Sequence, residues 1–183
     1  MPLLDDYLPV HQFSERHSRR MKAEPHAVLA AAAAYQPRSD RFIRAAIGLR
    51  ELPMRLFGLV SGRQAELPPA FGMDKFTLLD ERTGSERVYG LVGRFWKPNF
   101  GLVPVADGPA FLAFDEPGVA KLVLGFSATP EPGGFTTLTT ETRVFCPNAA
   151  TRRKFAPYWY LIRPVSGLIR GRMLAAIQRA CER

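Results

Sequence analysis

The stretch from Thr136 to Asn148 reads TTLTTETRVFCPN, and the chain continues directly with AATRRKFAPYWYLIRPVSGLIRGRMLAAIQRACER from Ala149 to Arg183. The first stretch is rich in β-branched residues that alternate with other side chains, a pattern that predicts a strand. The second is long, basic and helical in its spacing. We therefore expect a twisted sheet closed by a C-terminal helix, an arrangement that usually leaves an apolar cavity for hydrophobic ligands.

The C-terminal helix is predicted by its apolar stripe. Phe155, Trp159 and Ile162 recur at i, i+4 and i+7, so they share one face of a helix. Asn148 is a favourable residue for the N-terminal cap. Because proline removes a backbone hydrogen bond, we expect Pro164 to break or bend the helix before a second section continues.

The rest of the chain predicts an α+β protein, in which a sheet packs against helices. Alternation, helical spacing and turn residues predict strands at residues 10–21, 74–81, 87–96, 110–114, 119–129 and 134–146, and two short helices after the first strand at residues 24–35 and 41–57. The sequence thus favours a helix-grip architecture, with a curved antiparallel sheet of about six or seven strands wrapped around the last helix.

Length and composition indicate one domain over residues 1–183, because 183 residues with 46% hydrophobic and 23% charged side chains are ordinary for a single core. Cys146 and Cys181 are too few for a disulfide framework or a cysteine zinc site. The longest apolar run, Ala27 to Tyr35, is too short to cross a bilayer. The first residues, MPLLDD, carry acids where a signal peptide carries bases, so we expect no transmembrane segment and a cytoplasmic location.

The net charge of +8 is concentrated at the C-terminal end. Residues 149–183 carry eight basic and one acidic side chain, whereas residues 66–148 carry seven basic and ten acidic ones. A basic helix face can contact an anionic membrane or a partner protein. The alternative is a solvated face in an arginine-rich protein, and nucleic acid is disfavoured because the aromatic residues of this helix are assigned to the core. The predicted basic surface consists of Arg152, Arg153, Lys154, Arg170 and Arg172.

Short motifs are distributed over nearly the whole chain: ERHS at residues 15–18, GRFW at 93–96, EPG at 116–118, TETRV at 140–144, YWYLIRP at 158–164 and GLIR at 167–170. With these motifs the chain resembles the START-like, or SRPBCC, helix-grip superfamily of polyketide cyclases, aromatase-cyclases, plant pathogenesis-related proteins and lipid-transfer domains. Within it, the chain looks most like bacterial members of unassigned function. The resemblance implies the fold and an internal cavity, but the superfamily contains both binders and enzymes.

Glu15 and His17 lie two residues apart on the first predicted strand, so their side chains point to the same face. If that face lines the cavity, the histidine can act as a general base that the carboxylate orients. The alternative is a polar pair that satisfies its own hydrogen bonds or meets Arg19 or Arg143 at a sheet edge. A shared metal ion is disfavoured, because His11, Glu15 and His17 span too far along one extended strand.

Arg94 is flanked by Phe95 and Trp96 in a strand that is predicted to be mostly buried, where an unpaired guanidinium would be costly. We expect Glu141 or Glu15 to pair with it. The alternative partner is a carboxylate or phosphate of a ligand, which matches the guanidinium fork. Which alternate set of this strand faces inward stays open, because both sets are apolar.

These features favour the binding or carriage of a small hydrophobic molecule, such as a lipid, an isoprenoid or a polyketide-like ring. The alternative is a cyclase- or hydratase-like enzyme, a lyase or isomerase that uses Glu15 or His17 as acid and base. We expect no metal and no cofactor, because Gly90 and Gly93 lack the further glycines of a dinucleotide or phosphate motif. The predicted ligand-binding residues are Glu15, His17, Tyr89, Leu91, Arg94, Leu122, Leu124, Phe126, Leu138, Thr140 and Trp159.

Overall fold

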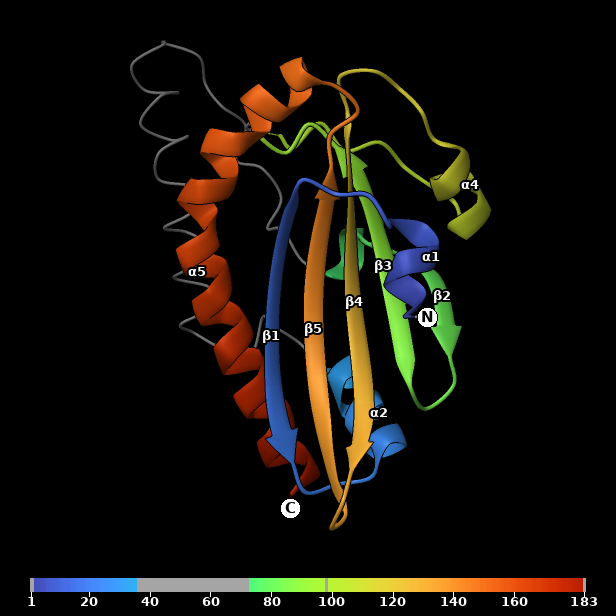
Figure 1. The fold of residues 1–183 in the computed structure, drawn as a ribbon, viewed down its shortest axis with the longest axis vertical. Helices are drawn as coiled ribbons and strands as arrows, with labels where there is room; N and C mark the ends of the chain where they lie inside the picture. Colours follow the sequence, from blue (N-terminus) through green and yellow to red (C-terminus); the bar gives the residue numbers. More distant parts are fainter. Residues whose placement is uncertain (1, 36–72, 98, 183) are drawn as a thin grey trace.

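A sheet with a long helix beside it forms the main part of the computed structural model, which describes residues 2–35, 73–97 and 99–182 (Figure 1). The strands are β1 (Phe13–Met21), β2 (Thr77–Arg82), β3 (Glu86–Gly93), β4 (Ala120–Glu131) and β5 (Phe135–Phe145). The helices are α1 (Leu3–Tyr7), α2 (Pro25–Ala34), the short 3₁₀ helix η2 (Met73–Lys75), α4 (Gly108–Ala113) and α5 (Ala149–Cys181). The helix predicted at residues 41–57 lies outside the described residues.

The strands pair antiparallel throughout, in the order β1-β5-β4-β3-β2. In the hairpin between β4 and β5, Glu131 pairs with Phe135. Gly133 and Gly134 in its turn have φ angles of 81° and 74°, a backbone region that favours glycine. The predicted hairpin is therefore confirmed, with β4 reaching further toward the turn than expected.

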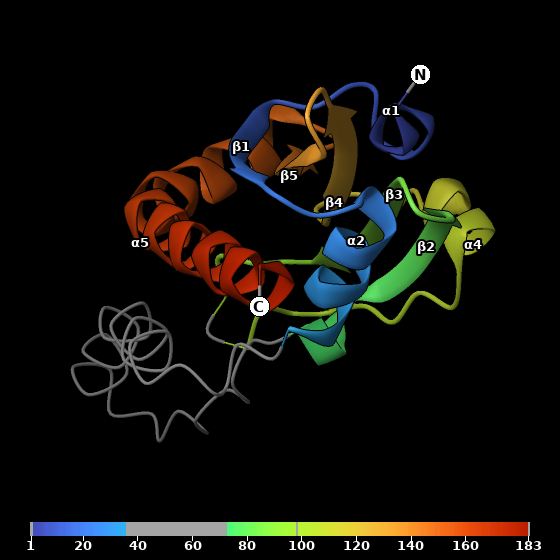
Figure 2. The same ribbon diagram turned by 90° about the horizontal axis from the view of Figure 1, so that it is seen from below.

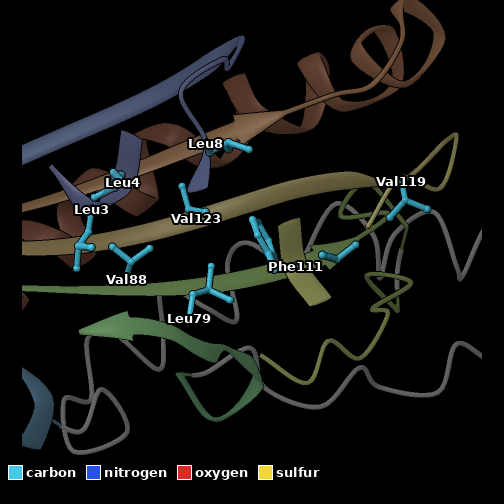
Figure 3. Packing of buried hydrophobic residues seen from close by; sticks show 9 residues of the cluster. Leu3, Leu4, Leu8, Leu79, Val88, Phe111, Val119 and Val123 are labelled. Carbon is cyan, nitrogen blue, oxygen red and sulfur yellow. The ribbon is translucent and has the colours of Figure 1, made fainter. Parts of the chain in front are cut away.

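Helices cover both faces of this sheet (Figure 2). On one face, Leu4 of α1 and Phe111 of α4 belong to a buried cluster with Val123 of β4 (Figure 3). On the other face, α2 and α5 pack together, and Ile177 of α5 belongs to a cluster with Leu124. Successive residues of β4 thus serve opposite cores, as the pleat of a strand requires.

The same alternation decides which side of β3 faces the last helix. Val88 and Val92 pack with the cluster under α1 and α4, whereas Tyr89 and Leu91 pack on the α5 side. β3 ends at Gly93, so the strand predicted through residue 96 is too long.

α5 is one continuous helix of 33 residues. Its predicted cap is confirmed, because the Asn148 side chain accepts a hydrogen bond from the Thr151 N–H at 2.8 Å. Of the break or bend predicted at Pro164, the break is wrong, because the helix continues through this residue. Pro164 frees the carbonyl of Tyr160, and both residues lie on the exposed side of α5, where water can satisfy that carbonyl.

The strand predicted at residues 110–114 is also wrong, because these residues lie in or directly after α4. Asp107 caps this short helix by accepting a hydrogen bond from the Ala110 N–H at 2.8 Å, and Pro109 suits a first helical turn. Local capping thus favours a helix in a short apolar run whose pattern would also suit a strand. As a result the described residues form five strands, not six or seven, while the α+β helix-grip plan itself is confirmed.

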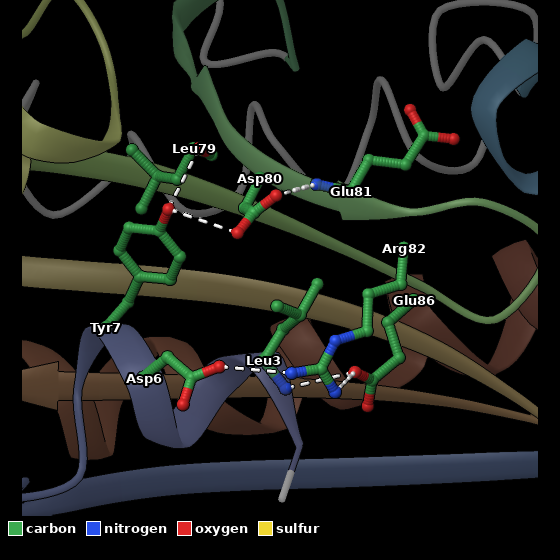
Figure 4. Close-up of polar contacts among 8 residues, drawn as sticks. All are labelled: Leu3, Asp6, Tyr7, Leu79, Asp80, Glu81, Arg82 and Glu86. Atoms are coloured by element: carbon green, nitrogen blue, oxygen red, sulfur yellow. Dashed lines mark hydrogen bonds and ion pairs between the residues drawn. The ribbon is translucent and has the colours of Figure 1, made fainter.

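α1 was not predicted, and its polar contacts explain why (Figure 4). The Leu3 N–H donates to Glu86 Oε2 at 3.0 Å. Arg82 donates to the same Glu86 oxygen at 3.0 Å and to Asp6 Oδ2 at 3.2 Å. A helix of five residues is unstable alone, so contacts with β2 and β3 hold α1 in place.

Packing between α1 and β4 predicts the effect of a single methyl group. A Cβ added at Gly125 would overlap the Leu4 side chain. We expect Gly125→Ala to lower the free energy of unfolding in urea by about 1–3 kcal/mol through overpacking. Gly171→Ala is the control, because a Cβ there meets nothing within 4 Å, and it should stabilise the exposed helix by about 0.5–1 kcal/mol.

The cost of Gly125→Ala should shrink in a Leu4→Ala background, since the overlapping side chain is then absent. An equal cost in both backgrounds would contradict the packing of α1 on β4.

Candidate functional site

A pocket of about 190 Å³ lies between the sheet and α5. The backbone of α5 approaches that of β1 and α2 most closely, which leaves space above the middle strands. Its lining is almost wholly apolar. From the sheet side come Glu15, Met73, Phe76, Phe95, Leu122, Leu124, Phe126 and Thr142, and from α5 come Phe155, Tyr158, Trp159, Ile162, Val165, Ser166, Ile169, Arg170 and Met173.

Two packed ends of α5 hold this pocket open. Near the N-terminal end of α5, Phe155 and Trp159 belong to a buried cluster with Phe13, and the Phe13 and Phe155 ring centroids are 5.0 Å apart. Near the C-terminal end, Leu174 and Ile177 belong to the cluster under α2. The pocket therefore lies where the helix spans the sheet between these clusters.

A histidine–carboxylate pair stands at the β1 side of the pocket. His17 Nε2 and Glu15 Oε1 are 2.8 Å apart, so the predicted shared face of these residues is confirmed. Glu15 is only 7% exposed and lines the pocket, whereas the His17 side chain is 32% exposed and does not. Since a carboxylate accepts, the Nε2 of His17 carries the proton in this bond.

The close passage of α5 over this pair depends on Gly167. A Cβ at Gly167 would lie 3.3 Å from Glu15 Oε1 and 3.5 Å from His17 Cε1. The absent side chain therefore allows the helix backbone to pass directly over the carboxylate.

Arg170 is the cationic side chain of the pocket. Its Nη1 donates to Thr140 Oγ1 at 2.7 Å, and its Nη2 donates to Thr142 Oγ1. Its buried Nε has no hydrogen-bond partner among the described residues. Burial lowers the pKa of Arg170, and the negative charge of Glu15 partly opposes this shift.

The assignment of Arg170 to the outer basic surface is therefore wrong. Arg170 follows Ser166 by four residues and precedes Met173 by three, so the helix turns all three side chains toward the pocket. Sequence reasoning could have found this signal, because the spacing continues the stripe of Phe155, Trp159 and Ile162. Phe76 and Phe95, which also line the pocket, lie just outside β2 and β3, although the strands predicted at residues 74–81 and 87–96 included them.

Arg94 is paired differently from the prediction. Its Nη2 donates to Glu116 Oε1 at 2.8 Å, and it is not among the residues that line the pocket. Glu141 is bonded instead to Arg143, with 2.7 Å between its Oε1 and the guanidinium Nε. Because β3 ends at Gly93, the guanidinium is 33% exposed and close to the acidic loop that follows α4.

The remaining predicted ligand-binding residues fall into two groups. Leu122, Leu124, Phe126 and Trp159 line the pocket. Tyr89 lines a second hollow of about 190 Å³, which shares Met73, Phe126 and Met173 with the first. Leu91 and Leu138 are buried in the core, and Thr140 reaches the pocket only through its bond to Arg170. A ligand-binding role for these residues stays a prediction.

Other reactive groups lie away from the pocket. Burial raises the pKa of the Cys146 thiol to about 11, so this cysteine is protonated near neutral pH and is a poor nucleophile. Within residues 2–35, 73–97 and 99–182, no three His, Cys, Asp or Glu side chains converge on a possible metal position. The charged side chains that line the pocket are thus Glu15 and Arg170.

The outer face of α5 carries both basic and apolar side chains. Arg152, Arg153, Lys154 and Arg172 are exposed, as predicted. Between them lie the exposed residues Tyr160, Leu161 and Leu168, at 65%, 58% and 57%. Among the described helices, none combines the length and the hydropathy that a membrane span requires.

Comparisons with known proteins give matches at the level of the fold. No protein-family model matches the chain, and no curated protein gives a significant match. A solved structure from Mesorhizobium loti is similar with a TM-score of 0.35 and 14% identity, covering 87% of this chain and 98% of that one. A protein from Thermus thermophilus gives a TM-score of 0.33 and 9% identity, covering 91% and 95%.

The Zhui aromatase/cyclase from a Streptomyces species is also similar, with a TM-score of 0.32 and 12% identity over 93% of this chain and 94% of that one. With such low TM-scores and identities, these likenesses carry no argument about ligand or reaction. The class of the protein follows from its own topology, which is an α+β helix-grip fold with a pocket between sheet and helix.

Proposed function

We propose that this protein binds a small hydrophobic molecule in the pocket between β4 and α5. The observation that carries the proposal is an apolar pocket of about 190 Å³ in whose lining the described residues contribute only two charged side chains. An engineered protein cavity of about 150 Å³ lined by apolar residues binds benzene, so this volume suits a ligand of one or two rings or a short acyl chain. Isoprenoid and polyketide-like molecules fall in this class.

The few polar groups of the pocket support selective binding. Ligand sites are typically apolar with a small number of placed polar groups that fix the orientation of the ligand. Glu15 and Arg170 provide such groups, and Thr142 adds a hydroxyl.

Filling the pocket from α5 tests the proposal. Val165 lines the pocket, and we expect Val165→Trp to weaken the binding of a naphthalene-sized probe about tenfold or more by occupying its space. Leu168→Trp is the matched control, because it adds the same side chain at a position that is 57% exposed on the same helix. The affinities are measured by isothermal titration calorimetry, and equal losses in both variants would argue against binding in this pocket.

A second candidate function is catalysis by a cyclase- or hydratase-like lyase or isomerase. The 2.8 Å contact between His17 Nε2 and Glu15 Oε1 favours it, because a carboxylate that orients an imidazole supports acid–base chemistry. Glu15 is the member of the pair that lines the pocket, so a ligand proton would reach His17 through or beside this carboxylate.

His17→Gln separates carrier from enzyme. The ligand is obtained by native mass spectrometry and organic extraction of the purified protein, and is then incubated with the wild type and the variant. For a carrier, we expect affinity to change only a few-fold and neither protein to convert the ligand. An enzyme would convert it and lose about 10²- to 10⁴-fold in turnover in the variant. His26→Gln, at an exposed position on α2, is the control.

A third candidate is peripheral docking of α5 on an anionic membrane, which the exposed Tyr160, Leu161 and Leu168 beside basic residues favour. We expect the full chain to sediment with phosphatidylserine vesicles at low salt and to dissociate as salt screens the charges. Because each surface cation contributes about 1 kcal/mol, Arg153→Gln with Lys154→Gln should weaken binding about 30-fold. Equal binding to neutral phosphatidylcholine vesicles would contradict this candidate.

A further inference from the structure

Arg170 differs from the other arginines that lie in or beside the sheet. Five of those arginines have a carboxylate within ion-pair distance, and they are Arg20, Arg82, Arg87, Arg94 and Arg143. The other two, Arg16 and Arg19 of β1, are exposed to solvent. The hydrogen bonds of Arg170 go instead to the hydroxyls of Thr140 and Thr142. A guanidinium whose hydrogen-bond partners are neutral is compensated here only in part, by the charge of Glu15, and such a charge is costly in an apolar surrounding.

Glu15 does not remove this charge by direct pairing. Its charge acts on Arg170, but its carboxylate is bonded to His17 at 2.8 Å, and no hydrogen bond joins Glu15 to Arg170. The Nε of Arg170 is buried and has no partner among the described residues. A guanidinium has five N–H donors, of which two are used here for the threonines. Arg170 therefore keeps N–H groups at the wall of the pocket that can donate to a ligand.

We propose that Arg170 forms an anion subsite of this pocket, and that the ligand is a small amphiphile with a carboxylate or a comparable planar anion on an apolar body. The inference rests on the proposed function, since it concerns the same pocket. The carboxylate pairs with the guanidinium, whose fork matches two carboxylate oxygens. The apolar body lies between Leu124 and Ile169, which line the pocket from the sheet and from α5.

The threonines position the guanidinium for this role. Thr140 and Thr142 are both buried, at 0% and 4% exposure, and they project from β5 on the α5 side. Their hydroxyls fix two nitrogens of Arg170 without neutralising it. This arrangement keeps the cation oriented and its charge available, which a carboxylate partner would not do.

A matched pair of probes tests the subsite. 1-Naphthoate and 1-naphthamide have the same two rings and a planar substituent, but only the first is anionic near neutral pH. Because a charge-assisted hydrogen bond contributes more than a neutral one, we expect the wild type to bind the naphthoate at least about tenfold more tightly in calorimetry. Arg170→Gln should abolish this preference while leaving naphthamide affinity within a few-fold.

Arg163→Gln is the matched control, because it removes one positive charge from an exposed position of the same helix. It should keep the preference, which would exclude a long-range effect of net charge. Arg170→Lys retains the charge without the fork and should give an intermediate preference. Circular dichroism verifies that each variant is folded, and the wild-type preference decides the question if Arg170→Gln does not fold.

The outcomes separate this inference from the proposed function. Tight, equal binding of both probes by the wild type would overturn the anion subsite and leave the hydrophobic pocket standing. A preference that survives in folded Arg170→Gln would also overturn it. Failure of the wild type to bind either probe would count against the proposed function itself.

Discussion

The structure depends on the packing of α5 against the rest of the fold at two places. Phe155 and Trp159 pack with Phe13 near one end, and Leu174 and Ile177 pack under α2 near the other. Between these two places α5 passes over the central strands, and the pocket lies there. Its walls are formed by Leu122, Leu124 and Phe126 of β4 and by Val165, Ile169 and Met173 of α5.

The features of this fold that depend on local chemistry were predicted correctly from the sequence. Asn148 caps α5, and Gly133 and Gly134 form the turn between β4 and β5, since few other residue types suit these positions. The alternation of Leu122, Leu124 and Phe126 also identified one wall of the pocket correctly. Each of these features depends on residues that are close together in the chain.

The features that could not be predicted depend on distant partners. α1 forms because β2 and β3 supply Arg82 and Glu86, more than seventy-five residues further along the chain. Arg94 pairs with Glu116 because β3 ends at Gly93, directly before it. The end of a strand is poorly marked by sequence. Arg170 was assigned to the surface by counting charges, although its helical position lies on the apolar stripe. A count of charges does not show to which side of the helix a residue points, whereas the helical period does.

The placement of charge inside the pocket follows one physical rule. A buried ion is tolerated when other groups compensate it. The Glu15 carboxylate is hydrogen-bonded to His17, and its charge also acts on Arg170. Arg170 has two hydroxyls that satisfy donors but supply no negative charge. Replacing both charged residues with apolar ones of similar size would remove this cost and close the pocket more tightly. Because such a core would be simpler to build, the retained pair of opposite charges facing an apolar space is better explained by recognition than by stability.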